Sequence, residues 1–301
     1  MTVSTTPSLL DRVAGAPISW GVCEAPGWGV ELPAGRVLSE MRGLGLASTE
    51  LGPTGYLGQS PTEVRTLLAS HQLSLVGGFV PVLMHAEPMA DLSEADAAMA
   101  TLAGSGAELV VLAAQSADGS YDRKVAVTDR QWANLLANLD RLRQLAGSHG
   151  LLACVHPHVG TAVESRAAVL RLIADSDVGL CLDTGHLLIG GMQPLELLEL
   201  APQRVRHVHL KDVRAGLAQR VAAGQLNYLD AVRAGLYAPL GDGDVPIGAI
   251  VLALEAAGYR GRYVLEQDCA LSEVPDQPGG PVGDVRRSLR MLEGIAAGVV
   301  A

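Results

Sequence analysis

The chain has 301 residues, a formal net charge of −10 and 49% hydrophobic residues, but only 3% aromatic residues. This length suits one α/β barrel, which typically needs about 250 residues, and aliphatic side chains can fill its core. The acidic charge and the lack of a basic stripe exclude a typical nucleic-acid partner. No apolar run reaches the roughly 18 residues of a membrane-spanning helix, so no membrane partner is expected either.

Residues 1–13 lack the long apolar core of a secretory signal, which favours a cytoplasmic protein. The cysteines support the same location because they are far apart and form no C-x-x-C pair. They are expected to be buried, reduced thiols at Cys23, Cys154, Cys181 and Cys269.

Short apolar runs alternate with longer stretches of helical periodicity along the whole chain. The expected strands cover residues 16–22, 46–51, 73–80, 109–113, 151–155, 179–182, 205–210 and 262–266. The expected helices cover residues 61–71, 93–102, 128–147, 164–174, 194–200, 226–236, 247–257 and 285–296. This alternation predicts a parallel sheet with helical crossovers. Eight repeats favour a single-domain (β/α)8 TIM barrel over residues 1–301, with an open doubly wound sheet as the alternative.

Polar side chains gather where the expected strands end, which is where barrels of this kind build their sites. The last four strands end in His156-Pro157-His158, Asp183-Thr184-Gly185-His186, His209-Leu210-Lys211-Asp212 and Glu266-Gln267-Asp268, and the first two lead to Glu24 and Glu50. Singly, each residue has an ordinary interpretation as a loop histidine, a helix cap or a solvated charge. Together they favour a metal site, because buried carboxylates are costly unless paired or metal-bound.

Several segments resemble the xylose isomerase-like TIM-barrel superfamily, which includes sugar phosphate isomerases, epimerases and AP endonuclease family 2. They are CLDTGHLLIGG at 181–191, RVRHVHLKDV at 204–213 and GYRGRYVLEQD at 258–268, and the resemblance covers nearly the whole chain. Two more, ISWGVCEAPGWG at 18–29 and VHPHVGTAVE at 155–164, are more specifically similar to the inosose dehydratases.

The resemblance implies one divalent metal ion (Mn, Co, Mg or Zn) held from strands five to eight. Its expected ligands are His156, Asp183, His209 and Glu266. Many relatives carry glutamate at the strand-five position, so the choice between His156 and His158 stays open here. Expected substrate contacts are Trp20, Glu50, His186 and Lys211.

The expected activity is that of a metal-dependent lyase of the inosose dehydratase type. Such an enzyme removes a proton next to the carbonyl of a keto-inositol or similar polyol and eliminates water, while the metal acts as a Lewis acid. Catalytic candidates are Glu266, His156, His158 and Lys211, with Lys211 favoured as an electrostatic clamp. A sugar isomerase or epimerase is the alternative, because its enediolate forms by the same first step.

Two other functions receive less support from the sequence. A DNA-repair endonuclease of this superfamily needs further histidines after strand seven, and none follows His209 in the segment LKDVRAGLAQRVAAG. A non-catalytic sugar-binding barrel would not need the metal set. By analogy with other barrels, the helix expected at 128–147 offers a surface for a homo-oligomer.

Overall fold

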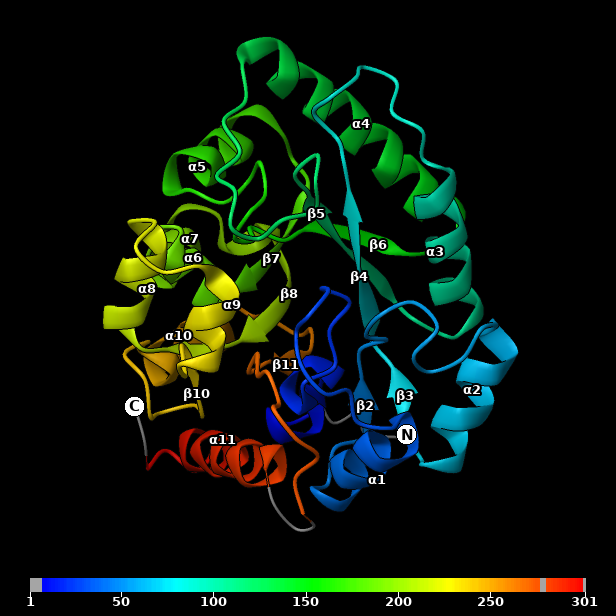
Figure 1. Ribbon diagram of the computed structural model, residues 1–301, viewed down its shortest axis with the longest axis vertical. Coiled ribbons are helices and arrows are strands. Elements are labelled where there is room, and N and C mark those ends of the chain that lie inside the picture. The colour runs from blue at the N-terminus through cyan, green and yellow to red at the C-terminus, as the bar shows by residue number, and fades with distance from the viewer. Residues whose placement is uncertain (1–6, 277–279, 300–301) are drawn as a thin grey trace, which may run out of the picture.

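The computed structural model describes residues 7–276 and 280–299 and shows a parallel β-barrel surrounded by helices (Figure 1). Its sheet has the order β3-β2-β1-β11-β8-β7-β6-β5-β4. The strands are β1 (Val13–Gly15), β2 (Ser48–Thr49), β3 (Ser74–Leu75), β4 (Gly77–Val82), β5 (Leu109–Ala114), β6 (Leu152–Val155), β7 (Gly179–Asp183), β8 (Val205–Leu210) and β11 (Tyr263–Leu265). Only Val76 separates β3 from β4, so the two edges of the sheet are consecutive in the chain and the sheet wraps into a barrel.

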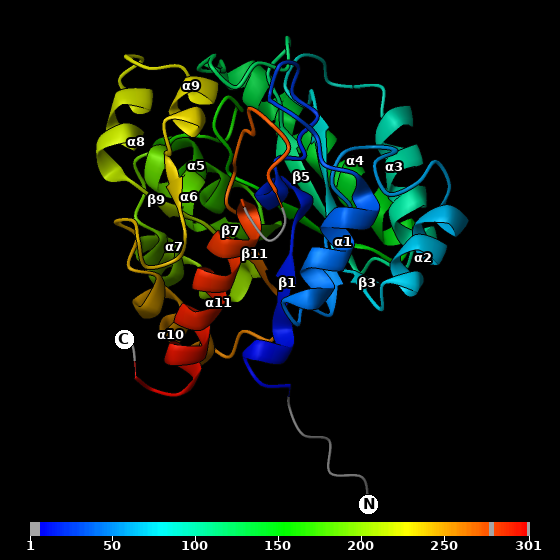
Figure 2. The same ribbon diagram turned by 60° about the horizontal axis from the view of Figure 1, so that its bottom comes forward.

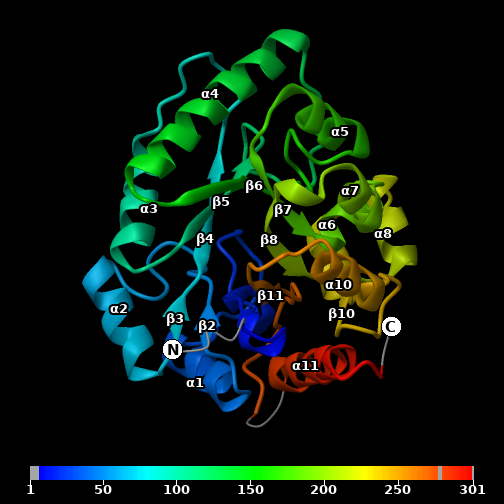
Figure 3. The same ribbon diagram turned by 180° about the vertical axis from the view of Figure 1, so that it is seen from behind.

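The helices form the outer layer, as the views from both sides show (Figures 1 and 3). They are α1 (Ala34–Gly43), α2 (Pro61–Ser70), α3 (Ser93–Gly104), α4 (Asp129–Ser148), α5 (Arg166–Asp175), α6 (Thr184–Ile189), α7 (Pro194–Leu200), α8 (Ala215–Ala222), α9 (Tyr228–Arg233), α10 (Ile247–Ala256) and α11 (Pro281–Ala296). Ser60 caps α2 as its position predicts, and Thr128 forms a capping box with Gln131 at the start of α4. No helix in the described part of the chain combines the length and apolar character needed to cross a bilayer.

The first strand differs from its prediction. The strand lies at Val13–Gly15, whereas Pro17–Trp20, inside the expected strand 16–22, forms a 3-10 helix. Pro17 has no N–H to donate to a strand ladder, and Gly21 ends the turn with a φ of 80°. Helices α1 and α6 were also not among the expected elements. The first six residues, where no secretory signal is expected, lie outside the described residues.

The barrel interior changes in character along its axis. Low in the barrel, Leu109, Val111, Cys154 and Cys181 form a buried apolar cluster. At the carboxyl ends of the strands the interior is lined by histidines and carboxylates instead. The loops after β1 and β11 and the short helices α8 and α9 gather at this end (Figure 2). A small antiparallel pair, β9 (Asp212–Val213) and β10 (Tyr237–Ala238), follows β8 there. All four cysteines are free thiols, as predicted, but only Cys154 and Cys181 are buried, whereas Cys23 and Cys269 are partly exposed.

Candidate metal centre and active site

Four side chains with metal-ligating atoms meet at the carboxyl end of the barrel. His156 follows β6, Asp183 ends β7, His209 lies on β8 and Glu266 follows β11. One ligand atom from each lies within 4.8 Å of those of the other three, and all four residues are buried. These are the four ligands expected from the sequence, and they come from four adjacent strands of the sheet.

The protonation of His156 leaves a lone pair directed at a carboxylate. Its Nδ1 lies 2.8 Å from the carbonyl oxygen of Pro157, which can only accept, so Nδ1 carries the proton in the neutral ring. Nε2 is then an acceptor, yet it faces Oδ2 of Asp183 at 3.1 Å. Burial alone would lower the pKa of His156, but Cys181 and Asp183 outweigh it and raise that pKa. Positive charge, from a proton or a cation, is therefore favoured between these two atoms.

His209 repeats this arrangement from the next strand. Its Nε2 lies 3.1 Å from Oε1 of Glu50, a carboxylate acceptor, so Nε2 carries the proton of the neutral ring. Nδ1 then faces Oε2 of Glu266 at 3.1 Å and Oδ2 of Asp183 at 3.5 Å, but makes no aligned hydrogen bond to either. A buried nitrogen with its lone pair aimed at two carboxylates is the arrangement that a cation would satisfy.

Asp183 serves two purposes with its two oxygens. Oδ1 accepts the backbone N–H groups of Gly185 and His186 at 2.9 and 2.8 Å, which caps helix α6. This cap fixes the carboxylate, so that Oδ2 faces His156 and His209. Asp183 can therefore cap helix α6 and also offer an oxygen to a metal ion.

The charge balance of the centre also fits a divalent cation. When ionised, the buried carboxylates Glu50, Asp183, Glu266 and Asp268 carry four negative charges against one positive charge on Lys211, which leaves three in excess if the imidazoles are neutral. Uncompensated buried charge is costly, and a divalent cation would remove most of the excess. Imidazole and carboxylate together are a donor set that suits such ions.

Lys211 is held as a cation at the edge of the centre. Its Nζ donates to Oδ1 of Asp268 at 2.6 Å and lies 3.1 Å from Oε2 of Glu266. Burial would lower the pKa of Lys211, but Asp268 and Glu266 outweigh it and raise that pKa well above its usual value. Tyr228 donates to the second oxygen of Asp268 at 2.7 Å and so fixes this carboxylate.

His158, the second histidine after β6, is outside the group of four ligand atoms. Its Nδ1 lies 2.7 Å from the carbonyl oxygen of Val159, so Nε2 is the acceptor nitrogen. Burial and the neighbouring His156 lower its pKa to about 3, which makes it an uncharged imidazole at neutral pH. The structure thus separates the two strand-five histidines: His156 joins the ligand group and His158 borders the cavity beside it.

A cavity of about 400 Å³ opens above the centre. Its lining includes the predicted site residues Glu50, His156, His158, His209, Lys211 and Glu266. Two expected substrate contacts are placed elsewhere among the described residues. Trp20 is fully buried and donates from Nε1 to Glu40 at 2.8 Å, and His186 lies behind the lining with its Nε2 3.2 Å from Nζ of Lys211.

Some lining residues were not among the predicted sites. Phe79, Tyr121 and Tyr228 form aromatic walls beside Trp28, and Asp268 holds Lys211. Strand alternation places Asp268 on the same face as Glu266, so this residue carried a usable signal. The tyrosines come from the loop after β5 and from α9, where periodicity carries no information about a distant site.

The sequence profile of the xylose isomerase-like TIM barrel family matches residues 38–294. The chain therefore belongs to the xylose isomerase-like TIM barrel family. It is 33% identical to the inosose dehydratase of Geobacillus thermodenitrificans over 273 residues, which cover 85% of this chain and 90% of that protein. The inosose dehydratase of Lacticaseibacillus casei is 30% identical, with 84% and 88% of the two chains covered. Since these relatives are enzymes and match most of the chain, the chain is an enzyme of this family.

Solved structures show the same fold at lower identity. An L-ribulose 3-epimerase superposes with a TM-score of 0.70 at 17% identity, covering 96% of this chain and 95% of its own. A protein named IolI, solved with a bound zinc atom, superposes with a TM-score of 0.67 at 13% identity, covering 96% and 99%. At these identities the likeness establishes the barrel architecture alone.

Proposed function

We propose that this chain is a metal-dependent lyase of the inosose dehydratase type, which removes water from a keto-inositol or a similar cyclic polyol ketone. One observation supports this proposal most strongly: His156 and His209 each aim an acceptor nitrogen at Oδ2 of Asp183, beside Glu266. The similarity to inosose dehydratases over most of the chain supports the choice of substrate class.

The proposed ligands of one divalent metal ion (Mn, Co, Mg or Zn) are His156, Asp183, His209 and Glu266. When bound, such an ion acts as a Lewis acid toward a substrate oxygen and stabilises negative charge that develops on it. Glu50 is proposed to hold His209 in position, because its Oε1 accepts from both His207 and His209 at 2.7 and 3.1 Å. Carboxylates in this position fix the ring orientation and tautomer of a ligating histidine.

The other side chains are assigned by their charge and hydrogen bonding. Nε2 of His158 is proposed to accept the proton next to the substrate carbonyl, because it is the acceptor nitrogen of a neutral ring at the cavity. Negative charge that develops on the substrate raises the low pKa that this ring has in the free protein, which makes the proton transfer more favourable. Lys211 remains protonated and stabilises negative charge on the neighbouring substrate oxygen. His158 then passes the accepted proton to the departing hydroxyl, and Glu266, which also borders the cavity, is the second candidate to accept and pass on the proton.

The cavity fits a small molecule with both polar and apolar faces. Histidine, lysine and carboxylate side chains form its floor, while Trp28, Phe79 and Tyr121 form walls. A ring polyol offers hydroxyl groups at its edge and C–H groups on its face, so it can bind both kinds of surface. A small polyol or sugar is therefore the proposed substrate class.

The test is incubation of the metal-loaded protein with a keto-inositol and with a panel of ketoses. Dehydration produces a conjugated enone or dione, which absorbs in the ultraviolet. A new sugar in the NMR spectrum without loss of water would instead assign the isomerase or epimerase alternative. His158→Gln is the matched variant, because it should lose turnover while keeping cation affinity; full turnover in this variant would refute the role of His158.

A further inference from the structure

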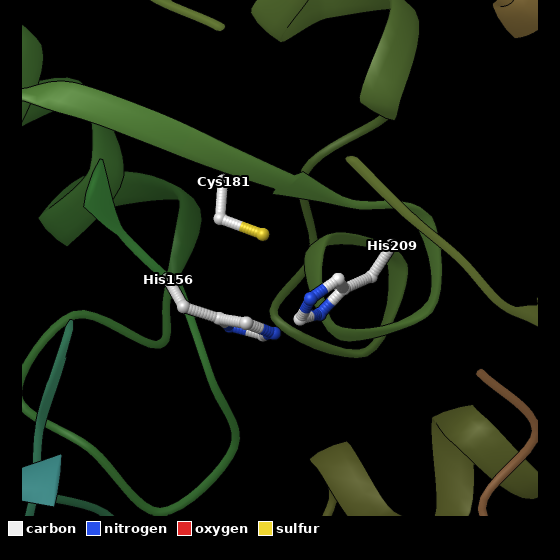
Figure 4. A group of neighbouring side chains, drawn as sticks. All are labelled: His156, Cys181 and His209. Atoms are coloured by element: carbon white, nitrogen blue, oxygen red, sulfur yellow. The ribbon is translucent and has the colours of Figure 1, made fainter. Parts of the chain in front are cut away.

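Cys181 lies directly below the carboxylate centre. It precedes Asp183 by two residues on β7, so both side chains point to the barrel interior and the thiol lies one layer deeper. Cys181 is fully buried, and Figure 4 shows its side chain projecting toward the rings of His156 and His209. One ligand atom from each of these three residues lies within 4.8 Å of the other two.

The thiol stands at the boundary between the apolar and polar parts of the interior. Below it are Leu109 and Val111, and beside it on β6 is Cys154, whose thiol lies 3.7 Å from the carbonyl oxygen of Val110. Cys154 belongs to the same apolar cluster but to none of the ligand groups found among the described residues. The two buried cysteines therefore differ in one respect: only Cys181 reaches the imidazoles.

We propose that His156, Cys181 and His209 form an alternative site for a thiophilic divalent ion, beneath the site that uses Asp183 and Glu266. A cysteine thiolate favours soft ions such as zinc and cadmium, whereas carboxylates suit manganese and magnesium. On binding, the thiol releases its proton to solvent and the sulfur becomes a ligand. Two imidazoles and one thiolate make three protein ligands, a number that zinc-like ions accept together with one further ligand.

The two sites exclude each other because they share both histidines. An ion coordinated by Cys181 withdraws His156 and His209 from Asp183 and Glu266, so the upper site cannot assemble at the same time. Thiophilic ions such as cadmium thus compete with manganese and magnesium, the harder ions among those proposed for the upper site. This inference rests on the cation site of the proposed function but not on the identity of its substrate.

The experiment titrates the metal-free protein with cadmium. A sulfur-to-metal charge-transfer band is expected in the wild-type protein and in Cys154→Ala, and its loss is expected in Cys181→Ala and Cys181→Ser. Cadmium affinity should fall at least about tenfold in the Cys181 variants, whereas manganese affinity stays within about twofold. Asp183→Asn should show the reverse, keeping the band and losing manganese.

Two results would overturn the inference. One is stoichiometric cadmium binding to the wild-type protein without a charge-transfer band. The other is a band that persists in both Cys181 variants. The serine variant keeps nearly the size of the cysteine, so it remains informative if the alanine variant folds poorly. Turnover with manganese is measured separately: a protein that shows the band but no reaction with any polyol refutes only the proposed function.

Discussion

Asp183 and Asp212 are both fully buried aspartates close to the carboxyl end of the barrel, but their surroundings differ. Asp212 accepts four backbone N–H groups, two on each oxygen, at 2.8 to 3.0 Å. Asp183 accepts two N–H groups on Oδ1 alone, and its Oδ2 faces two imidazole nitrogens and the ammonium of Lys211.

The difference shows how a buried carboxylate reveals its role. The donors of Asp212 come from the loop at Gly241–Val245 and from Val213, so the side chain is fully used in fixing that loop. Asp183 keeps one oxygen for atoms outside the backbone. A carboxylate with complete backbone partners supports folding, whereas one with an oxygen directed at ligand-type atoms marks a binding site.

The largest expected effect is that of Asp183→Asn. Asparagine keeps an acceptor oxygen for the cap of α6 but loses the negative charge on the side of the histidines. Cation affinity should fall at least about 100-fold. Changing a residue that only hydrogen-bonds to a metal ligand usually lowers the affinity by less, about 10- to 100-fold. Isothermal titration with manganese measures this affinity, and thermal unfolding tests that the barrel is intact. Unchanged manganese binding would remove Asp183 from the ligand set.

Asp212→Asn should act in the opposite way, on stability instead of cation binding. The amide NH2 group would face two backbone N–H donors, and each buried unsatisfied donor costs about 1–3 kcal/mol. The free energy of unfolding should therefore fall by about 2–6 kcal/mol, measured by urea denaturation. Folded protein should retain wild-type manganese affinity. A decrease in unfolding free energy below about 1 kcal/mol would mean that the N–H groups left without an acceptor bind water instead.

Glu50→Gln tests a carboxylate whose expected role lies between that of Asp183, a proposed ligand, and that of Asp212, which stabilises a loop. Glu50 borders the cavity, but its Oε1 is bonded to His207 and His209, so the structure favours a positioning role over direct substrate contact. Loss of its charge should weaken manganese affinity by about 10- to 100-fold. If KM for the substrate rises while manganese affinity is unchanged, the substrate-contact prediction made from the sequence is the better one.

The sequence predicted the second half of the barrel better than the first. Strands β5 to β8 begin or end within a residue or two of their predicted bounds. The reason is clearest for β5, β6 and β7, which are uninterrupted apolar runs that end at polar residues. The prediction of the first strand was wrong because a short apolar segment such as Ala16–Val22 can form either a strand or a 3-10 helix. Only the position of Pro17 distinguished these two structures.

Apart from the meeting of the four expected ligand residues, contacts between distant segments could not be predicted. The bond from Tyr228 to Asp268 joins α9 to the end of β11, and neither local sequence contains a sign of the other. The hydrogen bond between Glu50 and His209 likewise spans 159 residues. Strand alternation predicts which residues share a face, but the partner of a side chain depends on barrel closure, which no short segment encodes.

The smallest expected effects are those of replacing Trp20 or Trp28, the two tryptophans near the first strand, and they differ between the two residues. Trp28 lines the cavity and donates from Nε1 to the carbonyl oxygen of Cys269 at 2.7 Å, whereas Trp20 is buried against Glu40 outside that lining. Trp20→Phe should cost about 1–3 kcal/mol in unfolding free energy through lost packing and a lost hydrogen bond, with KM unchanged.

Trp28→Phe should raise KM by a few-fold, because it alters a wall of the cavity. Steady-state kinetics and urea denaturation of both variants measure these effects. A rise in KM for Trp20→Phe equal to that for Trp28→Phe would restore Trp20 as a substrate contact. The lining seen in the structure would then have to change when substrate binds, since the indole of Trp20 is fully enclosed without it.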